Sequence, residues 1–354
     1  MIRIAIFQND LGVGGIQKSL VNLLNSFDYE RFQVDLYLSC KESFWDVSFP
    51  EKLNVRYLKP TPRIFSFMPF DLAKTLLKYD FSGVEEYDLA IDFNSYQCSC
   101  AVGALSVPAK RRVMWIHNNV AIKLENEWKY RVLWNFFKGK FKYFDGFVPV
   151  SAALEAPFRA ASGVKDKPFT VIQNVINVDE IRRGSEAEPE GLKLDKSCMN
   201  FVALGRLCHQ KGYDLMLDIF AKALEKRGEL RLYIIGDGED RKTLEEQAEK
   251  LSIADKVTFL GRRENPYCYM KQMDAFVSTS RYEGQPLNIM EAMAIGLPLY
   301  CSKNLESYTE GLTGYDNMTE AIVNAPKQGK RPDDLVEYNN KILNSIAKLA
   351  TNAE

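Results

Sequence analysis

Residues 2–27 read IRIAIFQNDLGVGGIQKSLVNLLNSF, and this stretch gives the clearest indication of the fold class. The apolar run 2–7 is typical of a buried strand, and a loop containing glycines follows it. The apolar positions that then recur at helical spacing are Ile16, Leu20, Leu23, Leu24 and Phe27. Because the run 34–38 has the pattern of a second strand, the segment predicts a β-α-β unit of a parallel sheet.

The same alternation of short apolar runs and amphipathic stretches continues along the chain. The further runs that predict strands are 89–93, 113–116, 147–150, 169–172, 201–204, 232–235, 257–260, 275–278 and 299–301. Each ends in a polar residue or a turn, as parallel strands do. We therefore expect an α/β protein with two doubly wound, Rossmann-like domains that face each other across a cleft.

One charged segment interrupts this rhythm. Residues 182–198, RRGSEAEPEGLKLDKSC, contain almost no bulky apolar side chains, which predicts an interdomain linker. The predicted boundaries are a first domain over 1–176, a linker over 177–198 and a second domain over 199–330. Residues 331–354 are expected to form a helix that packs back across the junction.

The composition is that of an ordinary globular protein, with 46% apolar and 26% charged residues. Lys and Arg number 46 against 47 for Asp and Glu, which argues against a nucleic-acid partner. Seven cysteines without a CxxC pair predict reduced thiols. There is no apolar run of 18 residues and no signal-peptide pattern, so we expect a cytoplasmic protein.

The strongest functional signal is the stretch 283–298, EGQPLNIMEAMAIGLP. Pro286 suits the first turn of a helix, and Gly296 suits the position after its end. The backbone amides expected to point at the space beside Glu283 are those of Gly284, Gln285 and Leu287. Since the positive end of a helix dipole would lie behind them, this is a predicted anion site.

Glu283 and Glu291 are eight residues apart, or ~12 Å if both lie on one helix. A glycosidase pair needs a separation of roughly 5–9.5 Å, so these carboxylates do not fit that role. They could bind the two ends of one extended ligand. The alternative is a solvated helix with surface carboxylates.

Two cations lie in the stretch 205–212, GRLCHQKG. Arg206 and Lys211 flank a predicted turn from strand to helix, where they suit a diphosphate, although they could also be ordinary surface cations. Gly236 and Gly238 follow the next predicted strand and would let a flat group approach the backbone.

Gly14 and Gly15 could let backbone amides approach a phosphate. Their loop matches neither the GxGxxG fingerprint nor a Walker A loop. His117 follows the strand predicted over 113–116, where a ligand-facing group belongs. A lone histidine in this position could equally be structural.

Together these pieces resemble the retaining GT-B glycosyltransferases of family 4. The stretches that carry the resemblance are GGIQKSL, WIHN, VIQNVINVDEI, GRLCHQKG, IIGDGED, VTFLGRRE and EGQPLNIMEAMAIGLP, in order over residues 1–305. The resemblance implies that a nucleotide-sugar, such as a UDP- or GDP-sugar, is held mainly by the second domain. One departure is CSKNLESYTEG at 301–311, where family members often have a glycine-rich stretch.

The resemblance also implies roles for single residues. Arg206 and Lys211 would bind the diphosphate, and Glu291 the ribose hydroxyls. Glu283 and the amides after it would bind the transferred sugar. From the first domain, His117 would approach the sugar and Gly15 the diphosphate, and Asn174 lies in the family's strand-end asparagine motif near the hinge.

The predicted function is transfer of a sugar to an acceptor hydroxyl with retention of configuration. Four residues are predicted to be catalytic: His117, Glu283, Arg206 and Lys211. Arg206, Lys211 and the helix N-terminus would stabilise the leaving diphosphate, one of whose oxygens can take the acceptor proton. The chain has no DxD sequence, so we expect neither a metal nor a resident cofactor.

A separate signal, WKYRVLWNFFKGKFKYF at 128–144, combines aromatic side chains with five cations and no acid. This composition fits an anionic membrane surface. The apolar segment 64–70 could flank an acceptor. We therefore expect a glycan or lipid-linked acceptor and a protein peripheral on the inner face of the membrane. The alternative is a helix whose aromatic side chains form core and whose lysines are solvated.

Two other functions remain open. A nucleotide-sugar epimerase or an NAD-dependent oxidoreductase has similar architecture, although the dinucleotide fingerprint that an oxidoreductase needs is missing. The second alternative is a non-catalytic nucleotide- or glycan-binding protein. The presence of His117, Arg206, Lys211, Glu283 and Glu291 argues against a decayed site.

Overall fold

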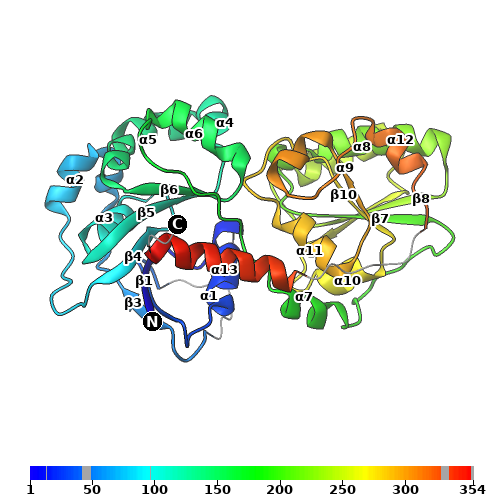
Figure 1. Cartoon of the computed structure of the whole chain (residues 1–354). Coiled ribbons are helices and arrows are strands. Elements are labelled where there is room, and N and C mark those ends of the chain that lie inside the picture. The colour runs from blue at the N-terminus through cyan, green and yellow to red at the C-terminus, as the bar shows by residue number, and fades with distance from the viewer. Residues whose placement is uncertain (13, 42–48, 96, 328–334, 352–354) are drawn as a thin grey trace. The chain divides into compact units, whose positions relative to one another are not determined.

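The computed structural model describes residues 1–12, 14–41, 49–95, 97–327 and 335–351. These form two units, the first comprising Met1–Val175 with Glu337–Glu354 and the second Ile176–Val336 (Figure 1). Each unit contains one parallel sheet with helices on both faces. Val13, 331–334 and 352–354, which belong to the predicted glycine loop and C-terminal helix, lie outside the described residues.

The sheet of the first unit has the strand order β3-β2-β1-β4-β5-β6. Its strands are β1 (Ile2–Gln8), β2 (Phe32–Leu38), β3 (Asn54–Tyr57), β4 (Tyr87–Asp92), β5 (Ala109–Ile116) and β6 (Gly146–Pro149). The direction in which strands are added reverses between β1 and β4, and ligands of open α/β sheets bind beside the strand ends at such a point.

Helices surround this sheet because the apolar strands are buried on both faces. The α-helices are α1 (Gly15–Ser26), α2 (Phe70–Leu76), α3 (Cys98–Ser106), α4 (Val120–Asn126), α5 (Trp128–Phe137), α6 (Glu155–Ser162) and α13 (Val336–Thr351). Among the described residues of this unit, the 3₁₀ turns are η1 (Arg63–Phe67), η2 (Lys138–Tyr143) and η3 (Ala152–Leu154). Because right-handed crossovers on either side of the reversal run in opposite directions, α1 and α3 cover opposite faces.

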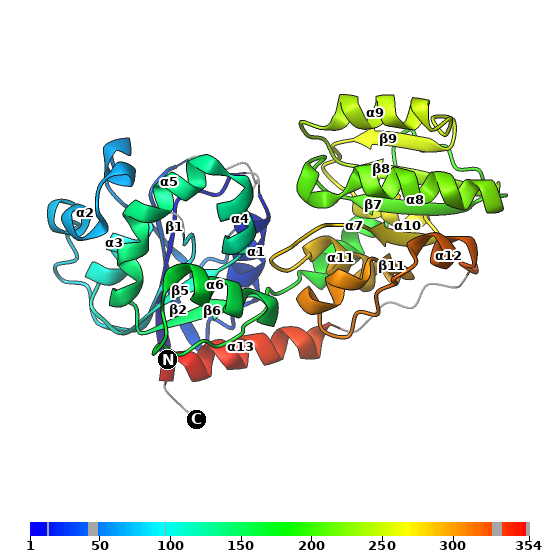
Figure 2. The same ribbon diagram turned by 90° about the horizontal axis from the view of Figure 1, so that it is seen from above.

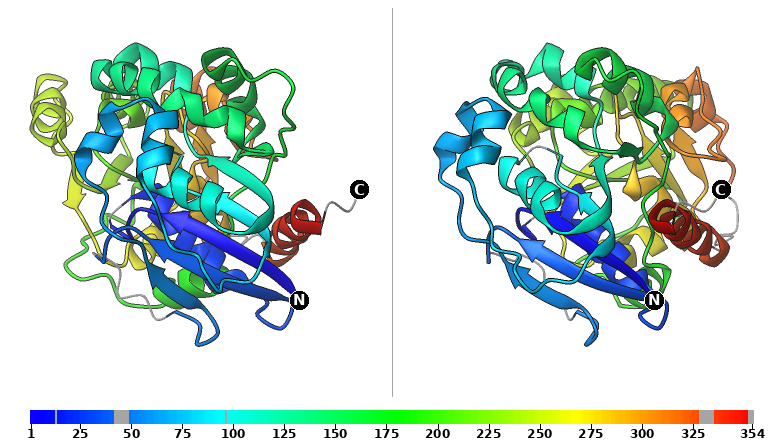
Figure 3. Two further views of the ribbon diagram at one scale, coloured as in Figure 1. Left: turned by 90° about the vertical axis from the view of Figure 1, so that its left-hand side faces the viewer. Right: turned by 60° about the vertical axis from the view of Figure 1, so that its left-hand side comes forward.

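Helix α13 packs against the first unit (Figure 3). A guanidinium nitrogen of Arg31 donates to Asn344 at 2.7 Å, and one of Arg111 donates to the Leu349 carbonyl at 3.0 Å. Ile346 is fully buried. The amphipathic pattern of the C-terminal segment therefore makes it an integral part of the first unit.

The sheet of the second unit has the strand order β11-β10-β7-β8-β9, and Figure 2 shows β7, β8 and β9 side by side. Its strands are β7 (Met199–Leu204), β8 (Leu230–Ile235), β9 (Val257–Gly261), β10 (Ala275–Ser278) and β11 (Leu299–Cys301). Its helices are α7 (Val178–Ser185), α8 (Tyr213–Lys226), α9 (Arg241–Lys250), α10 (Tyr267–Gln272), α11 (Leu287–Ile295) and α12 (Met318–Val323), with 3₁₀ turns η4 (His209–Lys211) and η5 (Lys303–Tyr308). The strand order reverses between β7 and β10.

Helices α8 and α12 pack together on one face of this sheet, while α7, α10 and α11 pack together on the other (Figure 1). Phe201 and Leu232 of the strands and Phe220 of α8 are fully buried in one continuous core. This packing fixes the ends of β7 and β10, the strands between which the order reverses.

Three details differ from the prediction. The run 169–172 forms no strand, although Thr170 N and Ile172 N donate to carbonyls of β6 at 3.0 and 3.1 Å. Strand β3 was missed because its sequence, NVRY, is largely exposed. The predicted linker 177–198 contains α7, whose Val178 and Ile181 are buried. The two apolar positions that anchor this helix are hidden in a charged sequence, and the segment belongs to the second unit.

Candidate active site

The predicted cations and one predicted carboxylate lie where the strand order of the second unit reverses. Arg206 and Lys211 follow β7, and Glu283 follows β10. The two loops are joined because Thr279 Oγ1 donates to the Gly212 carbonyl at 2.8 Å. Gly212 has a φ of +64°, and a Cβ there would lie 2.3 Å from the Thr279 carbonyl oxygen, so the approach requires glycine.

Lys211 and Glu283 form an ion pair with an Nζ–Oε1 distance of 2.6 Å. The Lys211 side chain is 19% exposed and that of Glu283 is 6% exposed. Gln210 Nε2 donates to the other carboxylate oxygen of Glu283 at 3.4 Å and to the Tyr282 carbonyl at 3.1 Å. Lys211, from the neighbouring loop, thus holds the largely buried carboxylate of Glu283, and the two charged groups lie in direct contact.

Arg206 is more accessible than Lys211. Its side chain is 72% exposed and forms a surface ion pair with Glu239 at 3.1 Å. Exposed ion pairs contribute little free energy. The guanidinium can therefore exchange Glu239 for an anionic ligand at small cost.

Gly236 and Gly238 have a packing role that the sequence did not reveal. A Cβ on Gly236 would lie 1.9 Å from the Gly205 carbonyl oxygen, and one on Gly238 would lie 2.2 Å from that of Leu207. These glycines allow the loops after β7 and β8 to contact each other. A requirement for glycine there follows from the fold itself, and ligand binding by either residue stays a prediction.

Helix α11 begins at Leu287, after Pro286, and ends at Gly296, which has a φ of +84°. Gly296 follows the helix as predicted, whereas Pro286 directly precedes its first residue instead of lying in the first turn. Gly284 and Gln285 are buried in the turn between Glu283 and the helix, and Leu287 is half-buried. Ligand contacts by their amides stay a prediction.

The position of Glu291 corrects one estimate. Glu291 lies on α11 and is buried, whereas Glu283 lies before the helix. The separation of ~12 Å derived from helical rise therefore does not apply. Tyr267 Oη donates to Glu291 Oε1 at 3.3 Å. The reading of both carboxylates as solvated helix residues is wrong, because both are buried.

In the first unit, the loop between β1 and α1 is organised around Asp10. Its Oδ1 accepts from Gly12 N at 2.9 Å and from Gln17 Nε2 at 3.2 Å. Gly14 precedes α1 with extended backbone, and Gly15 is the first residue of that helix. A Cβ on Gly15 would meet no atom within 4 Å among the described residues, so packing inside the unit does not require glycine there.

His117 follows β5 as predicted and is buried. Its Nε2 lies 3.0 Å from the Phe93 carbonyl oxygen, and its ring centroid lies 4.5 Å from that of Phe93. Burial lowers the pKa of His117 to about 3, so the ring is neutral at physiological pH. Because a carbonyl only accepts, Nε2 carries the proton and Nδ1 is left as a hydrogen-bond acceptor.

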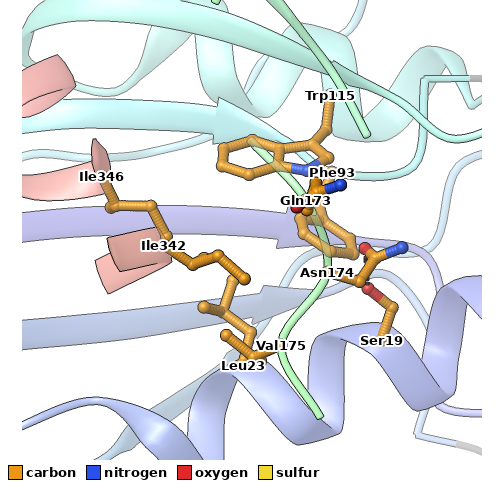
Figure 4. Close-up of a pocket in the computed structure, with 9 residues that line it drawn as sticks. All are labelled: Ser19, Leu23, Phe93, Trp115, Gln173, Asn174, Val175, Ile342 and Ile346. Carbon is orange, nitrogen blue, oxygen red and sulfur yellow. Dashed lines mark hydrogen bonds between the residues drawn. The ribbon is translucent and has the colours of Figure 1, made fainter. Parts of the chain in front are cut away.

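Asn174 contacts residues of both α1 and α13. Its Oδ1 accepts a hydrogen bond from Ser19 Oγ, and its carbonyl accepts from Tyr338 Oη at 2.9 Å. Figure 4 shows Asn174 beside a small pocket that Phe93, Trp115 and two isoleucines of α13 also line. These two contacts join parts of the first unit, and a hinge role for Asn174 stays a prediction.

The segment 128–144 is less exposed than predicted. It forms α5 and then η2, and Trp134 and Phe141 are buried. Lys140 is fully buried and paired with Asp92, so its assignment as a surface cation is wrong. A lysine can be buried when a carboxylate and a carbonyl satisfy its ammonium group. Lys142 is exposed but forms an ion pair with Asp71 at 2.8 Å.

Several site residues were missed by sequence reasoning. Gln210 and Tyr267 contact the two carboxylates, and Asn288 Nδ2 donates to the Leu204 carbonyl at 2.6 Å, which ties α11 to the end of β7. Gln210 lies inside the quoted stretch 205–212, and Asn288 lies inside 283–298. Along the sequence, both lie between residues that were predicted to bind the ligand, and this position could have identified them as site residues.

Within the described ranges, no group of three or more His, Cys, Asp or Glu residues could hold a metal ion. Over the same part of the chain, no helix is both long and apolar enough to cross a membrane.

Comparison with known proteins finds a family match in the second half of the chain. Residues 185–352 match the family described as glycosyl transferases group 1. The chain is 23% identical over 355 residues to a lipopolysaccharide 1,6-galactosyltransferase of Salmonella typhimurium, covering 95% of this chain and 88% of that protein. It is 30% identical over 168 residues to the lipopolysaccharide core biosynthesis mannosyltransferase LpsB of Rhizobium meliloti, covering 45% of this chain and 47% of that protein.

The chain spans less than half the length of several curated relatives, among them LpsB and an uncharacterized glycosyltransferase of Methanocaldococcus jannaschii, of which it covers 47% each. Solved structures match over nearly the whole chain. Anabaena Alr3699/HepE in complex with UDP and glucose aligns with a TM-score of 0.67 at 17% identity, over 99% of this chain and 100% of that one. The apo form of the lipopolysaccharide outer core galactosyltransferase WaaB aligns with a TM-score of 0.64 at 19% identity, over 98% and 95%. The predicted GT-B fold is confirmed.

Proposed function

We propose that this chain, whose residues 185–352 match the group 1 glycosyl transferases and which has the GT-B fold, is a member of that family and transfers a sugar from a nucleotide-sugar to an acceptor hydroxyl with retention of configuration. The observation that carries the proposal is the pair of Lys211 and Glu283 at the point where the strand order of the second unit reverses. It places a cation and a buried carboxylate where α/β sheets bind their ligands.

The proposed donor is a UDP- or GDP-sugar. Arg206 and Lys211 bind its diphosphate, and the ammonium of Lys211 has three protons, so it can contact a phosphate oxygen and keep Glu283 as a partner. As the bond between the sugar and the phosphate breaks, these cations stabilise the charge that develops on the leaving group. A phosphate oxygen takes the acceptor proton. No metal is needed for this charge stabilisation.

The two carboxylates have different proposed partners. Glu283 binds hydroxyls of the transferred sugar, and Glu291, held by Tyr267, binds the ribose. Both are buried and hydrogen-bonded, so their oxygens are oriented before the ligand arrives. The turn formed by Gly284 and Gln285 supplies backbone amides beside the sugar.

The first unit supplies the acceptor surface and His117. Because His117 is neutral and its Nε2–H is directed to a carbonyl, we propose that its Nδ1 accepts a hydrogen bond from a sugar hydroxyl. It orients the sugar and does not exchange a proton with it. Gly14 and Gly15 allow the β1–α1 loop to approach the diphosphate, which at Gly15 supplies the reason for glycine that packing does not.

We further propose a lipid-linked or surface-glycan acceptor, with the protein peripheral on the cytoplasmic face of a membrane. Support comes from exposed apolar side chains that the first unit presents on η1, α2 and α5: Ile64, Phe67, Leu72, Leu76, Trp128 and Val132. We call this set the apolar surface. Lys129 and Lys138 are exposed on the same segment as Trp128, which suits anionic lipid.

A panel of UDP-, GDP- and ADP-sugars tests the proposed activity. The protein should bind one nucleotide class and release its nucleoside diphosphate, and Lys211→Ala should reduce that release at least tenfold. Lys242→Ala, which removes an exposed lysine of the same unit, is the matched control and should leave it unchanged. If no nucleotide-sugar binds or is consumed, the protein is neither a sugar transferase nor a nucleotide-sugar epimerase. A glycan-binding function then becomes the better hypothesis.

A further inference from the structure

The turn that follows β4 is held by a fully buried ion pair. Lys140 Nζ lies 3.5 Å from Asp92 Oδ2 and donates to the Ser95 carbonyl at 2.5 Å. The side chains of Lys140 and Asp92 are both completely inaccessible to solvent. Lys140 thus connects η2 to both ends of a four-residue turn, Asp92–Ser95.

The same turn has an unusual backbone. Ser95 has a φ of +59°, in the left-handed region that residues with a Cβ rarely adopt. Its amide donates to Asp92 Oδ1 at 3.1 Å, and its hydroxyl donates to the Trp115 carbonyl at 2.5 Å. A conformation of this kind persists only where the surrounding contacts hold it. Here those contacts come from Asp92, Lys140 and the end of β5.

Phe93 lies inside this turn and is the residue that contacts His117. Its amide donates to the Phe7 carbonyl at 3.0 Å, and its own carbonyl holds His117 Nε2. Its ring stacks on Trp115 with a centroid distance of 5.6 Å, and Figure 4 shows both rings in the wall of the pocket beside Asn174. The direction of the Phe93 carbonyl is therefore fixed by the residues on either side of it.

A buried ion pair is weak evidence for a role in stability, because apolar side chains of similar volume often stabilise a fold as well or better. An ammonium group can do what an apolar side chain cannot. It binds a carboxylate and a carbonyl at the same time, and so it sets the geometry of the turn between them.

We propose that Lys140 is a positioning residue. By binding Asp92 and the Ser95 carbonyl, it fixes the Phe93 carbonyl and thereby selects the form of His117 with the proton on Nε2 and an accepting Nδ1. The consequence for sugar transfer rests on the proposed function, whereas the effect on the His117 ring does not.

The effect is measured on the ring itself. In protein labelled with ¹³C and ¹⁵N histidine, two imidazoles give signals, and the one that His117→Gln removes is His117. At pH 7 its nitrogen shifts should report one tautomer, with the proton on Nε2. The test variant is Lys140→Met combined with Asp92→Asn, which leaves no single charge buried.

The double variant should show a mixture of tautomers, and its Nε2 proton should exchange with water at least tenfold faster. The matched control is Lys142→Met with Asp71→Asn, which removes an exposed Lys–Asp pair two residues away and should leave the His117 signals unchanged. A folded double variant with the His117 signals of the wild type would overturn the proposal.

If the double variant does not fold, a single substitution in the same turn tests the proposal instead. Ser95→Ala removes only the hydrogen bond to Trp115, and it should shift the tautomer ratio in the same direction by a smaller amount. Unchanged signals in Ser95→Ala would then count against the proposal.

Turnover separates this proposal from the proposed function. If the protein transfers sugar, the double variant should lower kcat at least tenfold with an unchanged KM for the donor. If the wild type transfers none, the NMR result still stands and only the link to catalysis is lost.

Discussion

The sequence identifies Glu283 and Glu291 as candidate binding residues, but it does not identify the residues that contact them. Both were identified from their spacing in one stretch of sequence, and both are buried. Their partners, Lys211 and Tyr267, come from other elements. Spacing along the chain pointed to the acids, but only the fold could reveal which cation faces which carboxylate.

We predict that Glu291→Gln and Glu283→Gln fail in different ways. Glu291→Gln should weaken nucleotide binding by about 10- to 100-fold, because a charge-assisted hydrogen bond contributes roughly 1.5–3 kcal/mol. Glu283→Gln should retain most of the nucleotide affinity and lose turnover, since its partner is the sugar. Calorimetry with UDP and GDP, together with steady-state kinetics, checks both. Equal loss of nucleotide affinity in the two variants would contradict the assignment of one acid to each end of the donor.

His117 gives a prediction about pH. Burial lowers its pKa in the folded protein to about 3, below the value of ~6.5 expected in the unfolded chain. The unfolded state therefore binds more protons below pH 6.5, and this contribution to stability is present above that pH and is lost as the pH falls toward 3. The free energy of unfolding should decrease by about 1.4 kcal/mol per pH unit between pH 6 and 4 from this group alone.

Urea titrations at several pH values measure this slope. His117→Gln should remove it, and His209→Gln, at an exposed position, is the control that should keep it. A slope that is the same in the wild type and in His117→Gln would show that the ring is not buried in its neutral form.

The burial of Lys140 could not be predicted from the sequence around it. It stands in a run of cations and aromatic residues, where each lysine has the same pattern around it. Its partner, Asp92, is 48 residues away along the chain. A local pattern cannot identify a lysine that is buried by so distant a residue, and the prediction of five surface cations failed there.

At the scale of elements, the glycines fall into two classes. Gly212, Gly236 and Gly238 are needed because the backbone of a neighbouring loop lies within 2.3 Å of where a Cβ would be. Gly15 has open space around it in the described structure. Sequence alone placed all of these glycines at loops beside strand ends, but it could not separate packing from binding.

We expect Gly212→Ala and Gly15→Ala to behave in opposite ways. Gly212→Ala should destabilise the second unit by ~1–3 kcal/mol, because it combines a left-handed φ with a backbone clash. Gly15→Ala should leave the melting temperature unchanged or slightly raised, since alanine is the better helix former, and should slow consumption of the proposed donor. Differential scanning fluorimetry and a donor-consumption assay distinguish the two. A destabilised Gly15→Ala variant would assign that glycine to packing.

The elements themselves were predictable to different degrees. Central strands such as β7 and β8 are continuous apolar runs, and they were found because both faces of the sheet are covered. The edge strand β3 was missed because most of its side chains are exposed, and α7 was missed because two buried residues sufficed to anchor a charged helix. Strands that are buried on both faces can be recognised as apolar runs in the sequence, whereas an exposed edge strand or a charged helix cannot.

At the scale of the whole molecule, the chain consists of two doubly wound units, each with its own reversal of strand order. The predicted donor residues lie at the reversal of the second unit. The apolar surface belongs to the first unit. Charge alone gives no preference for a membrane, because the net charge is −1, so any attraction to lipid must come from a local surface.

We predict that the protein floats with anionic liposomes at low salt and that added salt weakens the binding, because screening shortens the reach of the charges. Trp128→Ala with Phe67→Ala should reduce flotation severalfold, since both side chains are more than half exposed. Leu215→Ala, an exposed apolar residue of the second unit, is the control. If the wild type stays at the bottom of the gradient with anionic lipid at low salt, a soluble acceptor is the better proposal.

We propose above all that the second unit uses protein cations to release a nucleoside diphosphate while a sugar is transferred. The most direct measurement follows the reaction with the preferred nucleotide-sugar by ¹H NMR in the presence of EDTA, for the wild type, Lys211→Ala and the control Lys242→Ala. We expect a product whose new anomeric bond has the configuration of the donor, a rate that EDTA does not change, and a rate at least tenfold lower only in Lys211→Ala. An inverted product, activity that requires Mg²⁺ or Mn²⁺, or an unchanged rate in Lys211→Ala would contradict it.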